Sequence, residues 1–406
     1  MTIAACDIPQ SISALRELVA ACDREGRKIS IVGGNTLAGL GLPPERADLT
    51  LSTASLVSVV DYVAADLTIA AQAGIPIQNL NVLLSGHGQF IPFDAPRPHY
   101  ATLGGTLAAG WLGPRRHLYG RLRDFLIGTS VVLADGSLAR AGGMVVKNVA
   151  GYDMSRLYVG SFGTLCVLVQ ANLKTLVMPS SARAFVARLP ERTRARACEY
   201  LAGLPARPSA AFWIDGFHNS IEGEDGPEGR IFALLEGSPA LLERATRELR
   251  SALGRAGVPE TRVIDAGCRE AFQRIVDAYI STLGERSVTY RISSMPDRSE
   301  ERTLALHDLA STFALRCETL VDVNNGDIVA RVSDLDSRAL GAKMEAFDDA
   351  LHRIESRAIV IACDHPRRAD LRVWGEPPAP IERMRELKRR FDPNRTLNPG
   401  RFIGGI

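Results

Sequence analysis

Up to about residue 178, short apolar runs of strand length alternate with segments in which apolar residues recur at helical spacing. From Ile12 to Arg24 the apolar positions fall three or four residues apart, which predicts an amphipathic helix with one buried face. The segment 77–84 predicts a second helix. Apolar runs bounded by turn residues predict strands at 29–32, 49–52, 67–74, 125–133 and 165–169. Between two of these runs, residues 134–137 (Ala-Asp-Gly-Ser) predict a hairpin turn.

The pattern changes at residues 178–181, beyond which the glycine clusters stop. Helices are predicted at 191–201, 240–256 and 346–355, and strands at 210–216, 230–235, 286–292, 319–323 and 358–362. This mixture is typical of an α+β domain with helices over an antiparallel sheet. A helix at 381–390 and a turn-rich end follow. We therefore expect a first domain at 1–178, an α+β domain at 179–375 and a C-terminal segment at 376–406.

Composition narrows the class of protein. The 406 residues carry a formal net charge of +2, which predicts no strong attraction to nucleic acid or to an anionic membrane surface. The seven cysteines are scattered and form no CxxC pair, so we expect no metal site and no cysteine-ligated iron–sulfur cluster. The chain begins without a basic and apolar leader, and no run of about 18 apolar residues occurs. These features predict a cytoplasmic protein that is peripheral to the inner membrane only through partner subunits.

Three glycine clusters carry most of the chemical information. They lie at 32–36 (Val-Gly-Gly-Asn-Thr), at 102–106 (Thr-Leu-Gly-Gly-Thr) and within 145–165, which contains three glycines, a lysine, an aspartate and several hydroxyls. Backbone N–H groups of glycine-rich turns bind phosphate oxygens, and the missing Cβ lets a ligand approach the backbone. A lone Gly-Gly pair is common in ordinary turns, but three such loops can enclose one long, phosphate-bearing cofactor. The GxGxxG fingerprint of an NAD site is absent.

Three motifs occur together in this chain: Val-Val-Lys-Asn-Val-Ala-Gly-Tyr-Asp at 145–153, Gly-Ser-Phe-Gly-Thr-Leu at 160–165, and an end at 391–401 with Phe-Asp-Pro and Leu-Asn-Pro-Gly-Arg. With them the chain resembles the vanillyl-alcohol-oxidase-type flavoproteins, whose FAD-binding module is called the PCMH-type domain. The resemblance covers roughly residues 1–178 and the tail from 376. It implies an α+β fold with a two-subdomain FAD-binding module and a separate α+β cap domain. Within the family, the chain looks most like the FAD-binding subunits of bacterial glycolate oxidases.

The resemblance also implies which residues bind FAD. The first cluster would hold the pyrophosphate, the second would line the flavin and pyrophosphate, the third would form a further wall, and the tail would complete the flavin site. The implied residues are Val32, Gly33, Gly34, Asn35, Thr36, Leu103, Gly104, Gly105, Thr106, Leu107, Gly110, Ala150, Gly151, Tyr152, Asp153, Val167 and Asn398.

Some members of the family attach FAD covalently through a histidine in or near the first loop. Residues 33–36 contain neither His nor Cys, so we predict non-covalent FAD. A bond to His99 or His117 is the less favoured alternative. Cys166 stands where the family usually places a glycine, and a small buried thiol still allows close packing there.

A dehydrogenase of 2-hydroxy acids needs an arginine to hold the carboxylate and a base or metal to take the hydroxyl proton. Related catalytic subunits carry a His-x-Gly-Asp-Gly-Asn metal motif, and the nearest stretch here, 322–327, has no histidine. His365, Arg291 and Arg372 are weak catalytic candidates, because loop histidines and sheet arginines are more often structural. The missing motif favours an FAD subunit that takes part in electron transfer. Its implied partners are a sister flavoprotein that oxidises glycolate to glyoxylate and an iron–sulfur subunit.

Two other functions remain open. The chain could be a self-sufficient FAD-dependent oxidoreductase of hydroxy acids or polyols, which dye reduction by the pure protein would support. It could also be a structural subunit that has lost its flavin, although the intact glycine clusters argue against this. The basic group Arg115, Arg116, His117, Arg121 and Arg123 predicts a solvated loop, with docking to an acidic partner or neutralisation of FAD phosphates as alternatives.

Overall fold

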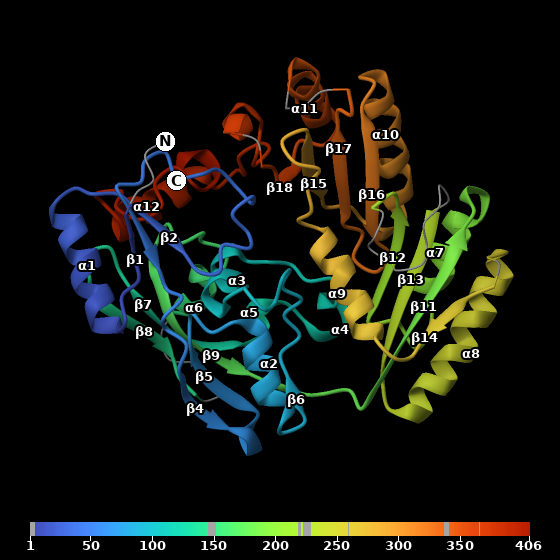
Figure 1. Cartoon of the computed structure of the whole chain (residues 1–406), viewed down its shortest axis with the longest axis horizontal. Helices are drawn as coiled ribbons and strands as arrows, with labels where there is room; N and C mark the ends of the chain where they lie inside the picture. Colours follow the sequence, from blue (N-terminus) through green and yellow to red (C-terminus); the bar gives the residue numbers. More distant parts are fainter. Residues whose placement is uncertain are drawn as a thin grey trace. The chain divides into compact units, whose positions relative to one another are not determined.

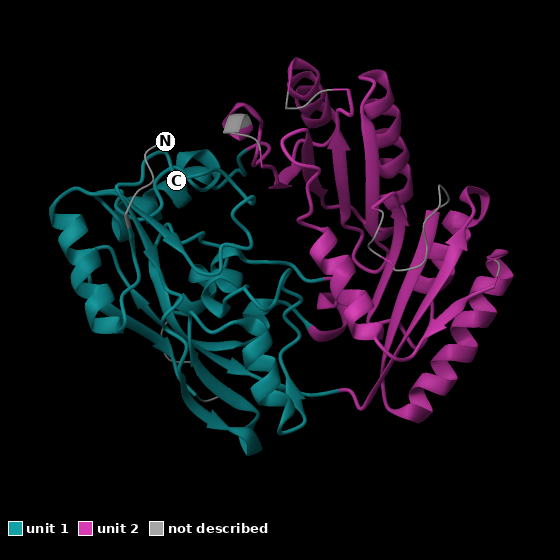
Figure 2. Cartoon of the chain, viewed as in Figure 1, with its two compact units in different colours: residues 1–113, 120–178, 377–406 teal, residues 114–119, 179–376 magenta. Residues whose placement is uncertain are grey.

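The computed structural model describes residues 5–144, 152–217, 221, 229–258, 260–336, 341–364 and 366–406. The chain forms two compact units, shown in Figure 2. Unit 1 comprises residues 1–113, 120–178 and 377–406, and unit 2 comprises 114–119 and 179–376. The C-terminal segment thus returns to the unit in which the chain begins.

Unit 1 contains a three-stranded parallel sheet in the order β1-β3-β2 (Ala5–Asp7, Leu49–Ser52 and Ile29–Val32). Helix α1 (Ile12–Arg24) begins at Ser11, whose side chain accepts a hydrogen bond from the N–H of Ala14 at 3.1 Å. Its apolar face is buried in the same core as β2 and β3. The helical spacing of the sequence therefore predicted both this helix and its buried face.

The second sheet of unit 1 is antiparallel, in the order β4-β5-β9-β7-β8. Its strands are Val59–Val63, Thr68–Gln72, Val167–Lys174, Leu126–Val132 and Leu138–Gly142. The remaining elements of unit 1 are α2 (Ile77–Ser85), β6 (Gln89–Phe90), α3 (Leu103–Ala109), α5 (Leu122–Phe125), α6 (Met154–Tyr158), β10 (Leu176–Val177), α12 (Ile381–Phe391) and 3₁₀ turns at Ala64–Asp66 and Ile403–Gly405. The predicted hairpin turn at 134–137 joins β7 to β8, with Gly136 at a φ of 80°.

Unit 2 is built on an eight-stranded antiparallel sheet in the order β14-β11-β13-β12-β16-β17-β15-β18. The strands are Arg262–Ile264, Ser181–Leu189, Gly229–Gly237, Ala210–Asp215, Arg316–Asp322, Ile328–Ser333, Ser287–Ile292 and Ile359–Ala362. The α-helices are α4 (Arg116–Tyr119), α7 (Arg194–Ala202), α8 (Pro239–Ala256), α9 (Cys268–Ala278), α10 (Ser299–Thr312) and α11 (Ala342–Ile354).

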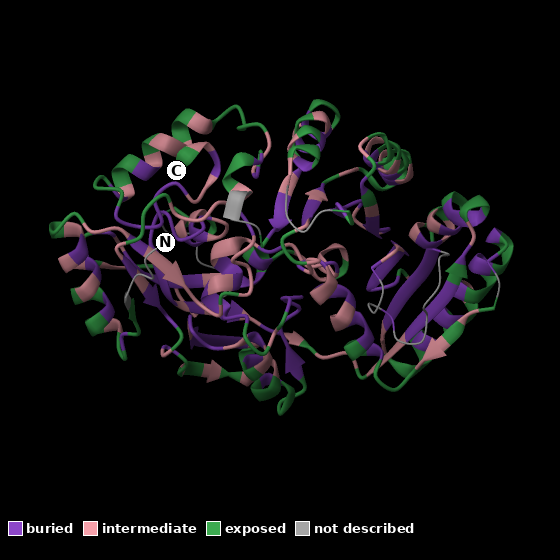
Figure 3. Cartoon of the chain, turned by 45° about the horizontal axis from the view of Figure 1, so that its top comes forward, coloured by how far each residue is buried: buried purple, intermediate pink, exposed green. Residues whose placement is uncertain are grey.

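Both faces of this sheet are covered by helices (Figure 1). On β12, the ring of Phe212 stacks on Phe272 of α9, whereas the adjacent Trp213 points to the other face and lies under Arg194 of α7. The central strands are consequently buried along almost their whole length, as Figure 3 shows in purple. Two covered faces explain why these strands read as continuous apolar runs rather than as an apolar–polar alternation.

The segment 114–119 belongs to unit 2 and is held there by buried ion pairs. Arg115 lies 3.0 Å from Glu236, and Arg116 lies 3.0 Å from Asp327 and 3.7 Å from Asp322. His117 contacts the carbonyl of Pro208 at 3.0 Å. The interpretation of this basic group as a solvated loop is therefore wrong for residues 115–117, because acidic residues distant in sequence pair with both arginines.

Candidate cofactor site

A hollow of about 740 Å³, part of it open to solvent, lies in unit 1 where the glycine clusters meet the tail. Its lining residues are Ile31, Val32, Gly33, Gly34, Asn35, Thr36, Leu37, Ala38, Thr53, Thr102, Gly104, Gly105, Ala108, Ala109, Phe162, Gly163, Cys166, Leu168, Asn398 and Arg401. Segments that lie far apart in the sequence therefore build one site.

The first glycine cluster follows directly from strand β2. A Cβ on Gly34 would lie 1.6 Å from the carbonyl oxygen of Tyr100, and one on Gly33 would lie 2.2 Å from the hydroxyl of Thr102. A side chain at Gly34 would require the backbone at 100–101 to move, and one at Gly33 would require the side chain of Thr102 to move. These glycines hold two loops together at the hollow and leave the backbone of 33–36 facing it.

The glycine content predicted a loop for the second cluster. In the structure these residues form helix α3 instead. The side chain of Thr102 caps this helix by accepting a hydrogen bond from the N–H of Gly105 at 3.2 Å. A Cβ on Gly104 would lie 2.7 Å from the Cβ of Ala73, so this glycine permits close packing of the helix on the chain after β5. The cap and this packing outweigh the low helix propensity of two adjacent glycines.

The third cluster packs against α3 through its backbone. The N–H groups of Gly160 and Phe162 donate to the carbonyls of Leu107 and Ala108 at 3.0 and 2.8 Å. The hydroxyl of Ser161 is buried and has no hydrogen-bond partner in the described structure. Burial raises the pKa of the nearby Cys166 thiol well above its usual range, so this lining residue is neutral and poorly nucleophilic.

The tail crosslinks the first and third clusters through Asn398. Its Oδ1 accepts a hydrogen bond from the N–H of Ile31 at 2.8 Å, and its Nδ2 donates to the carbonyl of Phe162 at 2.7 Å. Backbone hydrogen bonds between Ile29 and the tail continue this pairing at 2.7 and 2.9 Å. Asn398 has a φ of 41°, a left-handed conformation that asparagine tolerates better than most residues.

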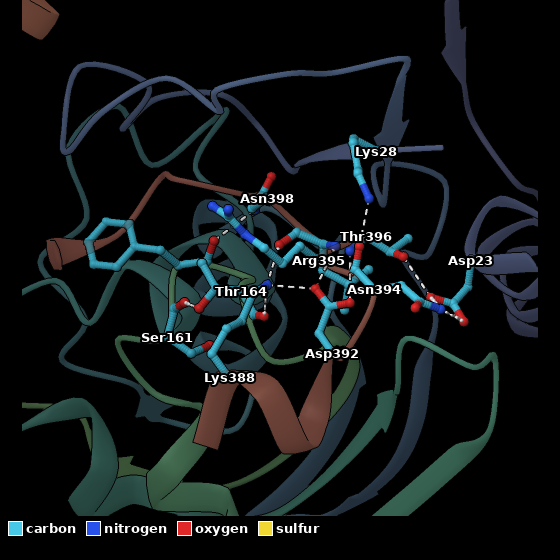
Figure 4. A network of polar contacts seen from close by, with 12 residues as sticks. Asp23, Lys28, Ser161, Thr164, Lys388, Asp392, Asn394, Arg395, Thr396 and Asn398 are labelled. Atoms are coloured by element: carbon cyan, nitrogen blue, oxygen red, sulfur yellow. Dashed lines mark hydrogen bonds and ion pairs between the residues drawn. The ribbon is translucent and has the colours of Figure 1, made fainter. Parts of the chain in front are cut away.

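Lys388 of α12 anchors the same region from beneath (Figure 4). Its Nζ donates to the carbonyls of Thr164 and Leu397 at 2.7 and 2.8 Å and to Asp392 at 2.6 Å. The Asp392 carboxylate also accepts hydrogen bonds from the N–H groups of Thr396 and Leu397. All three ammonium donors are thus satisfied, and the tail is fixed before it reaches Asn398.

The chemistry of the lining fits a long dinucleotide. Apolar side chains, glycine backbone, hydroxyls and amides make up the wall, and no carboxylate is among the lining residues of the described structure. The Cβ positions of Gly33 and Gly34 are taken up by residues 100–102, so the loop 33–36 packs closely there and lines the hollow with its backbone. Val32 to Thr36, Gly104, Gly105 and Asn398 would hold FAD when it is bound, and the cofactor would supply hydride and electron transfer.

The structure places the predicted cofactor residues in three groups. Those that line the hollow are Val32, Gly33, Gly34, Asn35, Thr36, Gly104, Gly105 and Asn398. Those that do not line it are Leu103, Thr106, Leu107, Gly110, Tyr152, Asp153 and Val167. Ala150 and Gly151 lie outside the described residues. Leu103, Thr106, Leu107 and Val167 are buried in the packing behind the wall, whereas Tyr152 is 92% exposed.

Several lining residues were missed by the sequence reasoning. Phe162 and Gly163 belong to a motif that was recognised, so its position alone could have suggested them. Arg401 ends the recognised Leu-Asn-Pro-Gly-Arg motif and is the one charged residue among the lining residues that the structure describes. Thr53, Ala108 and Ala109 carry no signal in the sequence, because only the fold brings them to the hollow.

The weak catalytic candidates all belong to unit 2. Arg291 lies near Arg116 and Asp327, and burial lowers its pKa. Arg372 pairs with Asp349 at 3.0 Å, and both side chains are about half exposed. His365 lies outside the described residues. Of the histidines weighed for covalent attachment, His99 is exposed in unit 1. His117 is half-buried in unit 2, where it contacts Pro208 and where partial burial lowers its pKa.

No group of His, Cys, Asp and Glu side chains with metal-binding geometry occurs among the described residues. Within the same part of the chain, no helix has the length and apolar character needed to cross a membrane.

Comparison with known proteins identifies the family. The profile of the FAD binding domain family matches residues 3–155. The chain is 30% identical over 407 aligned residues to glycolate oxidase subunit GlcE of Escherichia coli K12, covering 99% of both chains. This chain belongs to that family of FAD-binding oxidoreductases. It is also 24% identical to glycolate oxidase subunit GlcD of Bacillus subtilis and to D-2-hydroxyglutarate dehydrogenase of Xanthomonas citri, covering 97% and 98% of this chain and 88% of each relative.

Solved structures share the fold. An alkyldihydroxyacetonephosphate synthase superposes with a TM-score of 0.71 at 15% identity, covering 97% of this chain and 75% of that one. The 4-ethylphenol oxidase of Gulosibacter chungangensis superposes with a TM-score of 0.69 at 14% identity, covering 98% and 88%. The expected α+β class, with a PCMH-type FAD-binding module, is confirmed.

Proposed function

We propose that this chain is the FAD-binding subunit of a glycolate oxidase complex and takes part in flavin-mediated electron transfer as glycolate is oxidised to glyoxylate. The observation that carries the proposal is the meeting of β2, α3, the 160–166 segment and Asn398 around one hollow, in a chain alignable end to end with a GlcE subunit. The lining offers backbone N–H groups for a pyrophosphate and apolar walls for a ring system.

The bound FAD is non-covalent in this proposal. The loop 33–36 has no side chain that could form a bond to the flavin. Cys166 is the one thiol among the described lining residues, and burial keeps it neutral and therefore a poor nucleophile. The residues 1–178 with 376–406 act as the FAD-binding domain, and 179–375 act as the cap on the substrate side.

The partners in this proposal are a sister flavoprotein, which oxidises the hydroxy acid, and an iron–sulfur subunit, which passes electrons towards the membrane. Similarity to both GlcE and GlcD, each described as a subunit of glycolate oxidase, supports an assembly from related chains. The absence of a histidine from 322–327 supports an electron-transfer role over independent catalysis. Arg116 pairs with both aspartates of this stretch.

The deciding experiment is the absorption spectrum of the purified full chain, before and after acid precipitation, followed by anaerobic addition of glycolate. Flavin bands that pass into the supernatant, with no bleaching by glycolate in the native sample, are the expected result. Bleaching by glycolate would instead assign the whole dehydrogenase reaction to this chain. A protein that stays colourless after FAD is supplied would overturn the proposal for the isolated chain.

A further inference from the structure

Strand β4 forms one edge of the antiparallel sheet of unit 1, and among the described residues it pairs with β5 alone (Figure 1). Three valines of this edge are well exposed: Val57 at 47%, Val60 at 53% and Val63 at 36%. Exposed apolar side chains on the edge of a sheet favour association with another chain.

The other sheet edges in the described part of the chain are protected. The tail covers β2, where Leu397 bridges to Ile29, and on β18 the N–H of Val360 donates to the carbonyl of Val373. Strands β8 and β14 each carry an arginine, and β1, β6 and β10 are at most three residues long. Basic side chains, short strands and covering segments are devices that prevent pairing at a sheet edge. Strand β4 has five residues and none of them is basic.

A bulge determines how this edge can be used. Val59 pairs with Ala71 and Asp61 with Ala70, so Val60 is the extra residue of β4. A bulge bends its strand, which interrupts any long run of backbone pairing with an added strand. Val60 is also the most exposed of the three valines. The edge therefore suits docking through side chains centred on Val60 and Asp61.

The charge of the segment indicates what kind of partner fits it. Asp61 and Asp66 are exposed, and neither has a hydrogen bond or an ion pair among the described residues. Residues 57–66 contain no Lys, Arg or His. Two copies of the chain joined through this edge would gather four carboxylates without a compensating base, which opposes self-association. A partner that presents apolar side chains together with a basic residue matches both features of the edge.

We infer that the segment 57–66 is a docking surface for a partner subunit that presents an apolar segment with a basic residue. The inference rests on the proposed function, in which this chain works within a complex. Relatives described as subunits of glycolate oxidase support such an assembly. The inference adds the surface of this chain that makes the contact and the chemistry of the partner's side.

The test measures the dissociation constants of the full-length chain for the sister flavoprotein and for the iron–sulfur subunit, titrated separately at low and high salt. We expect Val60→Lys to weaken one of these affinities by about tenfold or more, because the contact would bury an unpaired charge. Asp61→Lys should weaken the same affinity, and Asp61→Asn should make its salt dependence shallower. Leu304→Lys, at an exposed position of α10, is the matched control and should bind as the unmodified chain does. Thermal unfolding of all variants should be the same, since the changed side chains are exposed.

Three results would overturn the inference. Val60→Lys and Asp61→Lys could bind both subunits as tightly as the unmodified chain. Leu304→Lys could lose as much affinity as Val60→Lys, which would make the loss an effect of net charge. Sedimentation of the unmodified chain alone could show a dimer that Val60→Lys dissociates, which would assign the edge to a second copy. If the unmodified chain bound neither subunit, the partners given in the proposed function would be wrong, and this inference would fail with them.

Discussion

The Nζ atom of Lys388 lies 2.6 Å from Oδ2 of Asp392, and the two residues are only 4% and 0% exposed. This buried ion pair joins the last helix to the cofactor site. Lys388 also donates to the carbonyl of Thr164 in the third glycine cluster, and Asp392 accepts from the N–H groups that lead to Asn398. The pair therefore holds two walls of the hollow at one point.

Removal of the lysine should leave a buried carboxylate without its counter-charge. For Lys388→Met we expect the free energy of unfolding to fall by about 3–5 kcal/mol, because an uncompensated buried charge is costlier than the loss of the attraction alone. Urea denaturation of the full chain measures this difference. FAD affinity should fall as well, since the carbonyls of Thr164 and Leu397 lose their common donor.

The surface provides the control for this prediction. Lys28 donates to the carbonyl of Asn394 at 2.6 Å in an exposed position, so Lys28→Met should change stability by less than about 1 kcal/mol. The double variant Lys388→Met with Asp392→Leu should be more stable than Lys388→Met alone, because no buried charge remains. Equal losses for the two lysines would show that the buried pair is not what anchors the tail.

Both the oxygen and the nitrogen of the Asn398 amide are expected to be needed for stability and FAD binding, because each makes a hydrogen bond to a different wall of the hollow. In Asn398→Leu, the N–H of Ile31 and the carbonyl of Phe162 lose their partners, and each buried unsatisfied group costs about 1–3 kcal/mol. Asn398→Asp keeps an acceptor for Ile31 but cannot donate to Phe162, and it adds a negative charge to a phosphate-binding wall. FAD affinity, measured by titration, should therefore be highest for the unmodified chain and lower for both Asn398→Leu and Asn398→Asp. An unimpaired Asp variant would contradict the role given to the Phe162 hydrogen bond.

The helices and strands were predictable where the hydrophobic pattern of a segment matches its burial in the folded chain. Helix α1 and strands β2, β3 and β12 show clear periodicity or compact apolar runs, and they occur close to the predicted bounds. Strand β17 was not predicted, because it places Arg331 in the middle of an apolar run. That arginine is buried beside Glu318 of β16, and such long-range pairing leaves no periodic signal.

In the candidate site, too, some residues could be predicted from the sequence and others could not. Gly33 and Gly34 are visible in the sequence because a glycine pair after a strand signals close backbone approach. Helix α3 was mistaken for a loop, because two glycines suggest flexibility unless the cap at Thr102 and the packing on Ala73 are known. Arg401 could not be assigned in advance, since only the folded tail shows that it, and not Arg395, lines the hollow.

Gly34 should tolerate no side chain. In Gly34→Ala the new Cβ would lie 1.6 Å from the carbonyl oxygen of Tyr100, so one of the two loops has to move. We expect a loss of about 1–3 kcal/mol in stability and at least a tenfold loss of FAD affinity, because the displaced loop lines the hollow in which FAD is proposed to bind. Thermal unfolding and fluorescence titration measure the two effects.

Gly254→Ala is the matched control for this substitution. Gly254 lies in helix α8, and a Cβ there would meet no atom within 4 Å. Alanine in a helix interior should stabilise the protein by up to about 1 kcal/mol and leave FAD binding unchanged. If Gly34→Ala behaved like Gly254→Ala, the close contact of the two loops would not be essential to the site.

The pH dependence of stability should contain a contribution from Asp322. Burial raises the pKa of this carboxyl to about 7, although Arg116 and the hydrogen bonds from Asn324 and Asn325 oppose the shift. Arg116 lies closer to Asp327, at 3.0 Å, than to Asp322, at 3.7 Å, so the compensation of Asp322 is incomplete. The neighbouring Asp327 carboxylate raises the same pKa further.

A raised pKa in the folded state means that the folded chain binds one more proton than the unfolded chain between about pH 4 and pH 7. This contribution to stability is present below pH 4 and is lost as pH rises through 7. The effect is at most about 4 kcal/mol over the window. Urea denaturation across this range should show a less negative slope of unfolding free energy against pH for Asp322→Asn than for the unmodified chain. Parallel curves would mean that Asp322 is ionised throughout and that Arg116 fully compensates both aspartates.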